Sequence, residues 1–120
     1  VLAGPVRRAF CAVRPPGHHA TRAQAMGFCL YNAVAVGALH ALDGRGLARV
    51  AVLDFDVHHG NGTEDIVGAD PRVLFASTHQ SPLYPGTGLP TNADRERGVH
   101  NLTLPPRAGS TAFRAAWEAD

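Results

Sequence analysis

Short apolar runs separated by polar loops make up most of the chain. Four of these runs have the length and composition of strands, namely Arg8–Val13, Ala48–Leu53, Arg72–Ser77 and Val99–Leu104. A longer segment, from Met26 to Leu42, is too densely hydrophobic for a surface helix and predicts a largely buried one. Shorter helices are expected at Thr63–Val67 and Ser110–Asp120.

The recurring order of strand, polar loop, helix and strand predicts an α/β fold with a parallel sheet flanked by helices. Ala48–Leu53 is β-branched and apolar, which is typical of a central strand covered on both faces. Parallel sheets bind their ligands beyond the carboxyl ends of the strands. Because the unusual polar residues of this chain follow predicted strands, we expect one functional site at that edge.

The length of 120 residues suffices for one small domain, and a hydrophobic content of 45% is that of an ordinary globular protein. The chain begins at Val1 without an initiator methionine and ends at Asp120 inside a predicted helix. We therefore expect it to be a piece of a longer domain.

Composition sets further limits on function. A formal net charge of +1, without a basic patch, gives no indication of nucleic-acid binding. No apolar run approaches the roughly 20 residues of a membrane helix, so no membrane association is expected and the expected location is cytoplasmic. Cys11 and Cys29 lie in apolar runs and are expected to be reduced core residues. Nothing in the sequence indicates the oligomeric state.

The most unusual stretch is VLDFDVHHGNGT at 52–63, where a predicted strand ends in carboxylates and imidazoles. Strand alternation would send Asp54, Asp56 and His58 to one side. A carboxylate and an imidazole two residues apart can bind one ion, and such oxygen and nitrogen donors suit Zn²⁺, Fe²⁺ or a related divalent metal. A metal site needs at least three ligands, however, and this strand supplies two. The alternative is a metal-free loop whose acids cap the next helix.

A pair of adjacent histidines, His18 and His19, follows another predicted strand. Pro15-Pro16-Gly17 precedes the pair, and the fixed proline dihedrals would hold it in place. Beside a metal, such histidines act either as ligands or as the acid and base that move protons around a bound water. A structural pair without a metal is the alternative.

Four motifs occur together in this chain: RPPGHHA at 14–20, GFCLYN at 27–32, DFDVHHGNG at 54–62 with TED at 63–65, and STHQSPLYPGTG at 77–88. In order and spacing they resemble the zinc-dependent histone deacetylase superfamily, which includes acetoin-utilisation proteins and acetylpolyamine amidohydrolases. The first motif is more similar to the class II branch than to class I. The resemblance implies an arginase-like α/β fold, of which residues 1–120 would be the central part of a single catalytic domain, truncated at both ends.

The resemblance also implies roles for individual residues. Asp56 and His58 match two ligands of one catalytic Zn²⁺. His18 and His19 match the tandem catalytic histidines of the family. His19 would be the general base that takes a proton from water, and His18 would be its electrostatic partner.

Each of these histidines would have its own partner in the family pattern. Asp54 matches the carboxylate behind His18, where it would favour the charged imidazolium. Asn61 matches the residue behind His19, and a neutral amide would orient that ring without stabilising its charge.

Substrate and ion binding are implied as well. Phe28 and Tyr84 match two aromatic residues that line an acyl-lysine channel, and Gly27 would let the channel wall approach the substrate. Asp54 and Ser77 match side chains that hold a structural monovalent cation such as K⁺, together with the carbonyls of Asp56, His58 and Thr78.

The function implied by the resemblance is hydrolysis of an N-acetyl amide on a lysine-like or polyamine substrate. The third zinc ligand of the family, an aspartate, and its transition-state tyrosine match positions beyond Asp120, so we expect residues 1–120 alone to bind zinc weakly and to be inactive. One alternative is a non-catalytic reader of acetyl groups or pseudoenzyme. Another is a ureohydrolase relative with two manganese ions, which would require more carboxylate ligands than this cluster contains.

Overall fold

Three parallel strands form the sheet of the computed structural model, which describes residues 1–118. The strands are hydrogen-bonded in the order of the chain: β1 (Val50–Asp54), β2 (Val73–Gln80) and β3 (Val99–Leu104). The helical segments are α1 (Ala33–Leu39), the π-helical turn η1 (His40–Gly44), α2 (Asn61–Val67), α3 (Asn92–Glu96) and α4 (Ser110–Glu118). The last two residues of the final predicted helix, 119 and 120, lie outside the described residues.

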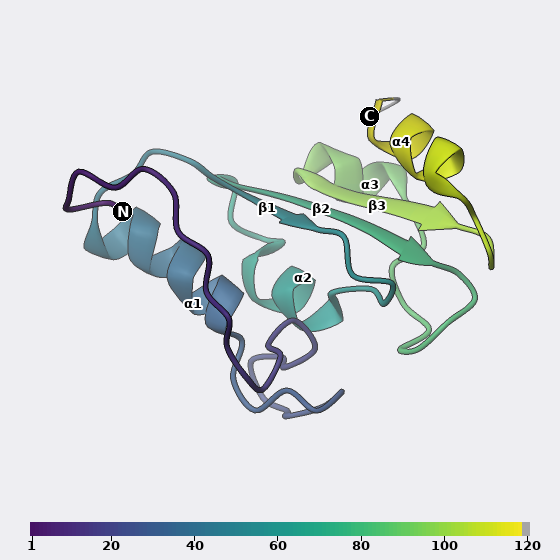
Figure 1. Cartoon of the computed structure of the whole chain (residues 1–120), viewed down its shortest axis with the longest axis horizontal. Coiled ribbons are helices and arrows are strands. Elements are labelled where there is room, and N and C mark those ends of the chain that lie inside the picture. Colours follow the sequence, from purple (N-terminus) through teal and green to yellow (C-terminus); the bar gives the residue numbers. More distant parts are fainter. Residues whose placement is uncertain (119–120) are drawn as a thin grey trace.

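The helices lie on both sides of the sheet, which confirms the predicted α/β fold (Figure 1). In this view α1 and α2 lie on one side, and α4 lies on the other side beside β3. No helix in the described part of the chain is long and apolar enough to cross a membrane.

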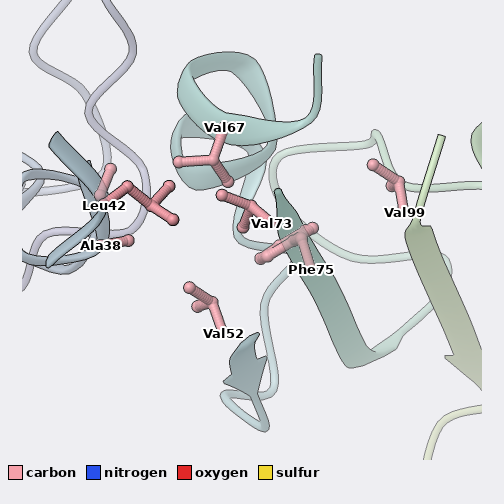
Figure 2. Close-up of a cluster of buried hydrophobic side chains, with 8 residues drawn as sticks. Ala38, Leu42, Val52, Val67, Val73, Phe75 and Val99 are labelled. Atoms are coloured by element: carbon pink, nitrogen blue, oxygen red, sulfur yellow. The ribbon is translucent and has the colours of Figure 1, made fainter. Parts of the chain in front are cut away.

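The hydrophobic core lies between the sheet and the two helices α1 and α2 (Figure 2). It consists of small and β-branched residues around one aromatic ring: Ala35, Ala38, Leu42, Val52, Val67, Val73, Phe75 and Val99. Full burial of a side chain the size of valine or phenylalanine contributes about 1.5–3 kcal/mol. The core therefore fixes α2 against β2, and this placement sets the position of the loops at the carboxyl ends of the strands.

One strand prediction is wrong in part, and another is wrong. β1 is an edge strand of the described sheet, and its Leu53 is 56% exposed, whereas β2 is central and its Phe75 is fully buried. The predicted strand Arg8–Val13 is an exposed segment without strand structure, and Cys11 is exposed with it. A strand requires a neighbour for its backbone hydrogen bonds, which local hydrophobicity does not provide. Cys29 is buried, as predicted.

The long predicted helix is also shorter than expected. It begins at Ala33, where the Asn32 side-chain oxygen accepts a hydrogen bond of 3.0 Å from the backbone of Ala35. Gly27 and Phe28 have φ angles of +56° and +62°, which no right-handed helix can accommodate. α1 buries Ala35 and Ala38 and packs the half-buried Leu39 against the core, while Val34 and Val36 are exposed.

Gly62, in the first turn of α2, is expected to be essential for stability. A Cβ atom at this position would lie 2.3 Å from the carbonyl oxygen of Ala20, a backbone atom that cannot swing aside. Gly62→Ala should therefore lower the free energy of unfolding by about 3 kcal/mol. Gly37 provides the matched control because it lies inside α1 and has nothing within 4 Å of the position that a Cβ atom would occupy.

Gly37→Ala should raise the free energy of unfolding by about 0.5–1 kcal/mol, since alanine is the better helix former. Urea unfolding followed by circular dichroism measures both changes. An equal loss of stability in the two variants would contradict the predicted clash at Gly62.

Candidate active site

Polar side chains gather beyond the carboxyl ends of β1 and β2. Asp54, the last residue of β1, is paired in register with Ser77 of β2. After Asp54 the chain turns: Asp54 Oδ1 accepts a hydrogen bond from the Asp56 amide (3.1 Å), and Asp56 Oδ1 accepts one from the His58 amide (2.8 Å). These two side-chain turns, rather than the predicted strand alternation, direct Asp56 and His58 toward the site.

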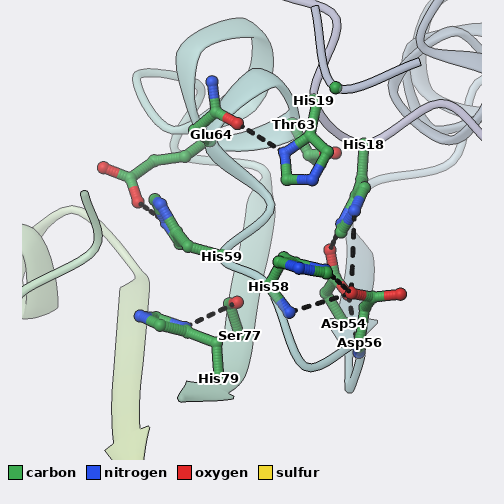
Figure 3. A network of polar contacts seen from close by, with 12 residues as sticks. His18, His19, Asp54, Asp56, His58, His59, Thr63, Glu64, Ser77 and His79 are labelled. Atoms are coloured by element: carbon green, nitrogen blue, oxygen red, sulfur yellow. Dashed lines mark hydrogen bonds and ion pairs between the residues drawn. The ribbon is translucent and has the colours of Figure 1, made fainter. Parts of the chain in front are cut away.

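His18 is paired with Asp54 at the end of β1 (Figure 3). Its Nδ1 atom lies 2.8 Å from Asp54 Oδ2, and both side chains are mostly buried. Burial lowers the pKa of His18, but the hydrogen bond with Asp54 and the charge of that carboxylate outweigh it, so the pKa is raised above the ordinary histidine value. The Asp54 partner therefore favours the imidazolium form of His18.

His19 has a neutral partner instead. Its Nδ1 atom donates to Asn61 Oδ1 at 2.8 Å, since an amide oxygen can only accept, and this leaves the lone pair on Nε2. Burial, together with the nearby His18 and His58, lowers the pKa of His19 below the ordinary value. The rings of His18 and His19 lie only 4.1 Å apart, yet the pKa of His18 is raised and that of His19 is lowered.

The first turn of α2 holds the histidine pair in place. The backbone amides of Gly62 and Thr63 both donate to the His18 carbonyl, at 2.9 and 3.1 Å. Amides of a first helical turn have no partner inside the helix, so they are free to bind this carbonyl. The Asn32 side-chain amide donates to the Ala20 carbonyl at 3.2 Å and to the Thr63 hydroxyl at 3.1 Å. The backbone on both sides of His19 is thus anchored.

Asp56 and His58 are the candidate metal ligands. Asp56 Oδ1 lies 3.0 Å from His58 Nδ1, and the two side chains are 50% and 38% exposed. Burial raises the pKa of Asp56, but hydrogen bonds from His58 outweigh it, so the pKa is lowered and the side chain is a carboxylate. An oxygen and a nitrogen donor this close together suit one Zn²⁺ ion. No group of three His, Cys, Asp or Glu side chains within residues 1–118 can hold a metal, so these donors fit two positions of a zinc site.

The three predicted channel residues line one pocket with these groups. The pocket is formed by Pro16, His18, His19, Gly27, Phe28, Asp56, His58 and Tyr84. The Tyr84 ring lies edge-on to His19 with the ring centroids 5.1 Å apart, and Phe28 is 94% exposed. A Cβ atom on Gly27 would lie 2.3 Å from the His19 ring, so only glycine lets the backbone come this close.

Ser77, a candidate side chain for the monovalent cation, is fully buried next to Asp54. Its hydroxyl lies 3.0 Å from Nδ1 of His79. The structure therefore brings the two predicted cation-binding side chains to neighbouring positions and adds His79 as a partner of Ser77.

A second group of polar residues was not predicted from the sequence. His59 is 2% exposed, and its Nε2 atom lies 2.9 Å from Glu64 Oε2 (Figure 3). The same carboxylate oxygen also accepts a hydrogen bond of 2.9 Å from the Asn101 side-chain amide. Burial raises the pKa of Glu64, but these two hydrogen bonds outweigh it and lower the pKa. The repeated His-His pair was a signal for His59, whereas only the pairing of β2 with β3 brings Asn101 to this group.

Comparisons with known proteins place these features in a family. Residues 1–119 match the family model described as histone deacetylase domain. The chain is 46% identical to histone deacetylase 14, chloroplastic, of Arabidopsis thaliana, over 91% of this chain and 26% of that protein. It is 43% identical to human histone deacetylase 9, over 87% of this chain and 11% of that protein.

A solved structure has the same arrangement of elements. The acetylpolyamine aminohydrolase from Burkholderia pseudomallei is 40% identical, with a TM-score of 0.78 over 88% of this chain and 32% of that one. The α/β sheet of this chain thus matches part of the arginase-like fold. The chain spans about a quarter to a third of the length of the first curated relatives that it matches.

Proposed function

Because this chain belongs to the histone deacetylase domain family, we propose that it is the central part of a zinc-dependent catalytic domain that hydrolyses N-acetyl amides. The observation that carries this proposal is the pair of adjacent histidines with different partners: the Asp54 carboxylate binds His18, and the neutral Asn61 amide binds His19. Both histidines line the pocket that contains the Asp56 and His58 donors. This arrangement combines two metal donors with a neutral base and a charged neighbour.

The base of the proposed reaction is Nε2 of His19. Since its Nδ1–H donates to Asn61, the Nε2 lone pair can take a proton from the water that attacks the acetyl carbonyl. His19 would then return this proton to the leaving amine. The imidazolium of His18, favoured by Asp54, would stabilise negative charge on the reacting oxygen.

Zinc would be held by Asp56 and His58, with a third ligand from outside residues 1–120. Bound zinc supplies a Lewis acid that polarises the carbonyl and lowers the pKa of a water molecule. Phe28 and Tyr84 would enclose the aliphatic stem of a lysine or polyamine substrate, because both line the same pocket as the donors. Asp54 and Ser77 would also contribute to a monovalent cation site.

The proposal predicts metal-dependent release of acetate by the full-length protein. Purified protein should hydrolyse an acetyl-lysine peptide or an acetylpolyamine, lose this activity after dialysis against a zinc chelator, and regain it when one equivalent of Zn²⁺ is added. Liquid chromatography of the free amine measures the reaction. If the zinc-loaded protein bound the acetyl-lysine peptide or the acetylpolyamine without hydrolysing it, the protein would instead be an acetyl-group reader. Hydrolysis of a guanidino substrate with two Mn²⁺ per chain would indicate a ureohydrolase.

A further inference from the structure

The loop that carries Tyr84 is attached to two buried histidines that take no part in the proposed reaction. The Thr87 hydroxyl lies 2.8 Å from Nδ1 of His59, and the Gly88 carbonyl accepts a hydrogen bond of 3.0 Å from Nε2 of His79. Each of the two histidines is only 2% exposed. Residues 87–88 at the end of the loop are therefore hydrogen-bonded to buried imidazole rings.

Both imidazole rings are held on their other side as well. His59 Nε2 is bound to Glu64 of α2 at 2.9 Å, and His79 Nδ1 is bound to Ser77 of β2 at 3.0 Å (Figure 3). Since a carbonyl only accepts, Nε2 of His79 carries the proton and Nδ1 accepts from the Ser77 hydroxyl. The ring centroids lie 4.7 Å apart. All four ring nitrogens have partners, so neither ring can turn without losing a hydrogen bond.

Gly88 lies directly on the two rings. A Cβ atom on Gly88 would come within 2.5 Å of the His59 ring and 2.7 Å of His79 Nε2. Gly86, two residues earlier, has nearly the same φ angle, +83° against +81° for Gly88, but nothing lies within 4 Å of its Cβ position. The close approach is therefore a property of Gly88 and not of the loop backbone in general.

We propose that His59 and His79 are positioning residues that hold the loop 81–88 and thereby fix Tyr84 against the reaction pocket. This inference rests on the proposed function. Tyr84 lies three residues before Thr87, and its ring lies edge-on to His19 and His58. A channel wall that is fixed before substrate binds reduces the entropy lost on binding. Loosening it should weaken substrate binding more than it slows the proton transfer at His19.

The test compares Gly88→Ala and Thr87→Val with the matched control Gly86→Ala in the full-length, zinc-loaded protein. Both alanine variants need the same positive φ angle, so they differ in the contact with the histidines. Thr87 is exposed, and valine keeps its shape while removing the hydroxyl that binds His59. Gly88→Ala and Thr87→Val should raise the KM for an acetyl-lysine peptide at least about fivefold and change kcat less than about twofold. Gly86→Ala should leave the KM near the wild-type value.

Hydrogen exchange of the peptide covering residues 81–88 gives a readout that does not depend on activity. We expect exchange in Gly88→Ala and Thr87→Val to be at least about fivefold faster than in wild type and Gly86→Ala, with equal zinc content in all four proteins. Unchanged exchange in both loop variants overturns the inference, and so does an equal increase in Gly86→Ala. If Gly88→Ala does not fold, the hydrogen exchange and KM of Thr87→Val alone test the inference. Absence of turnover in the wild-type protein would refute the proposed function. The hydrogen exchange of residues 81–88 would still test whether His59 and His79 hold the loop.

Discussion

Replacement of His19 by alanine in the full-length protein is expected to reduce deacetylation at least about 100-fold, because general base catalysis contributes a factor of this size or more. His19 is the histidine whose Nε2 lone pair remains free, since Nδ1 donates to Asn61. The zinc content should stay unchanged because His19 is not one of the two proposed ligands. The rate of acetate release at saturating substrate, with metal analysis of the same sample, measures both effects.

His40→Ala is the matched control for loss of an imidazole. His40 is exposed and lies at the start of η1, outside the pocket. Its replacement should leave both turnover and zinc content at the wild-type level. Turnover retained in His19→Ala would refute the role of His19 as the base, even if the deacetylase activity itself were confirmed.

Replacement of either proposed zinc ligand, as in Asp56→Ala or His58→Ala, should reduce zinc affinity at least about 100-fold and abolish activity. Even partners that only orient metal ligands contribute about 10- to 100-fold to affinity, so removal of a ligand should cost no less. Competition with a chelator of known affinity, followed by metal analysis of the recovered protein, measures the change.

His18→Ala separates the two roles that the sequence left open for the histidine pair. If His18 is an electrostatic partner, this variant should lose activity and retain zinc, because Asp56 and His58 would still supply both proposed donors. Loss of zinc in His18→Ala, with zinc retained in His58→Ala, would mean that the histidine pair holds the metal instead.

Local hydrophobicity predicted the bounds of the strands better than it predicted which segments pair with another strand. The bounds of β3 were predicted correctly, and those of β1 and β2 within a few residues, because β-branched runs have a strong local preference for extended structure. Arg8–Val13 has a similar pattern and is not a strand in the described structure. The difference lies in backbone hydrogen bonds to another strand, which a sequence window does not contain.

The backbone angles at Gly27 and Phe28 also show what a local hydrophobicity pattern fails to predict. The apolar segment from Met26 onward predicted a helix, but Gly27 and Phe28 adopt positive φ angles that a helix excludes. A side chain at position 27 would also clash with the His19 ring, and a hydrophobicity pattern does not reveal this contact. Asn32, whose side chain caps α1, was a local signal for the true start of the helix.

The sequence by itself determined the α/β class and the edge of the sheet where polar groups collect, because strand and turn preferences act over a few residues. The candidate site residues came from the order and spacing of the four motifs, and their roles remain predictions. The family resemblance implied a partner for His18 and another for His19, but only the tertiary structure brings these side chains within hydrogen-bonding distance. Asp54 and Asn61 lie 36 and 42 positions away from these histidines along the chain. Asp54 raises the pKa of His18, whereas burial and the nearby His18 and His58 lower the pKa of His19. The attachment of the Tyr84 loop to His59 and His79 likewise exists only in the folded chain, because hydrogen bonds and burial depend on distance in space rather than in sequence.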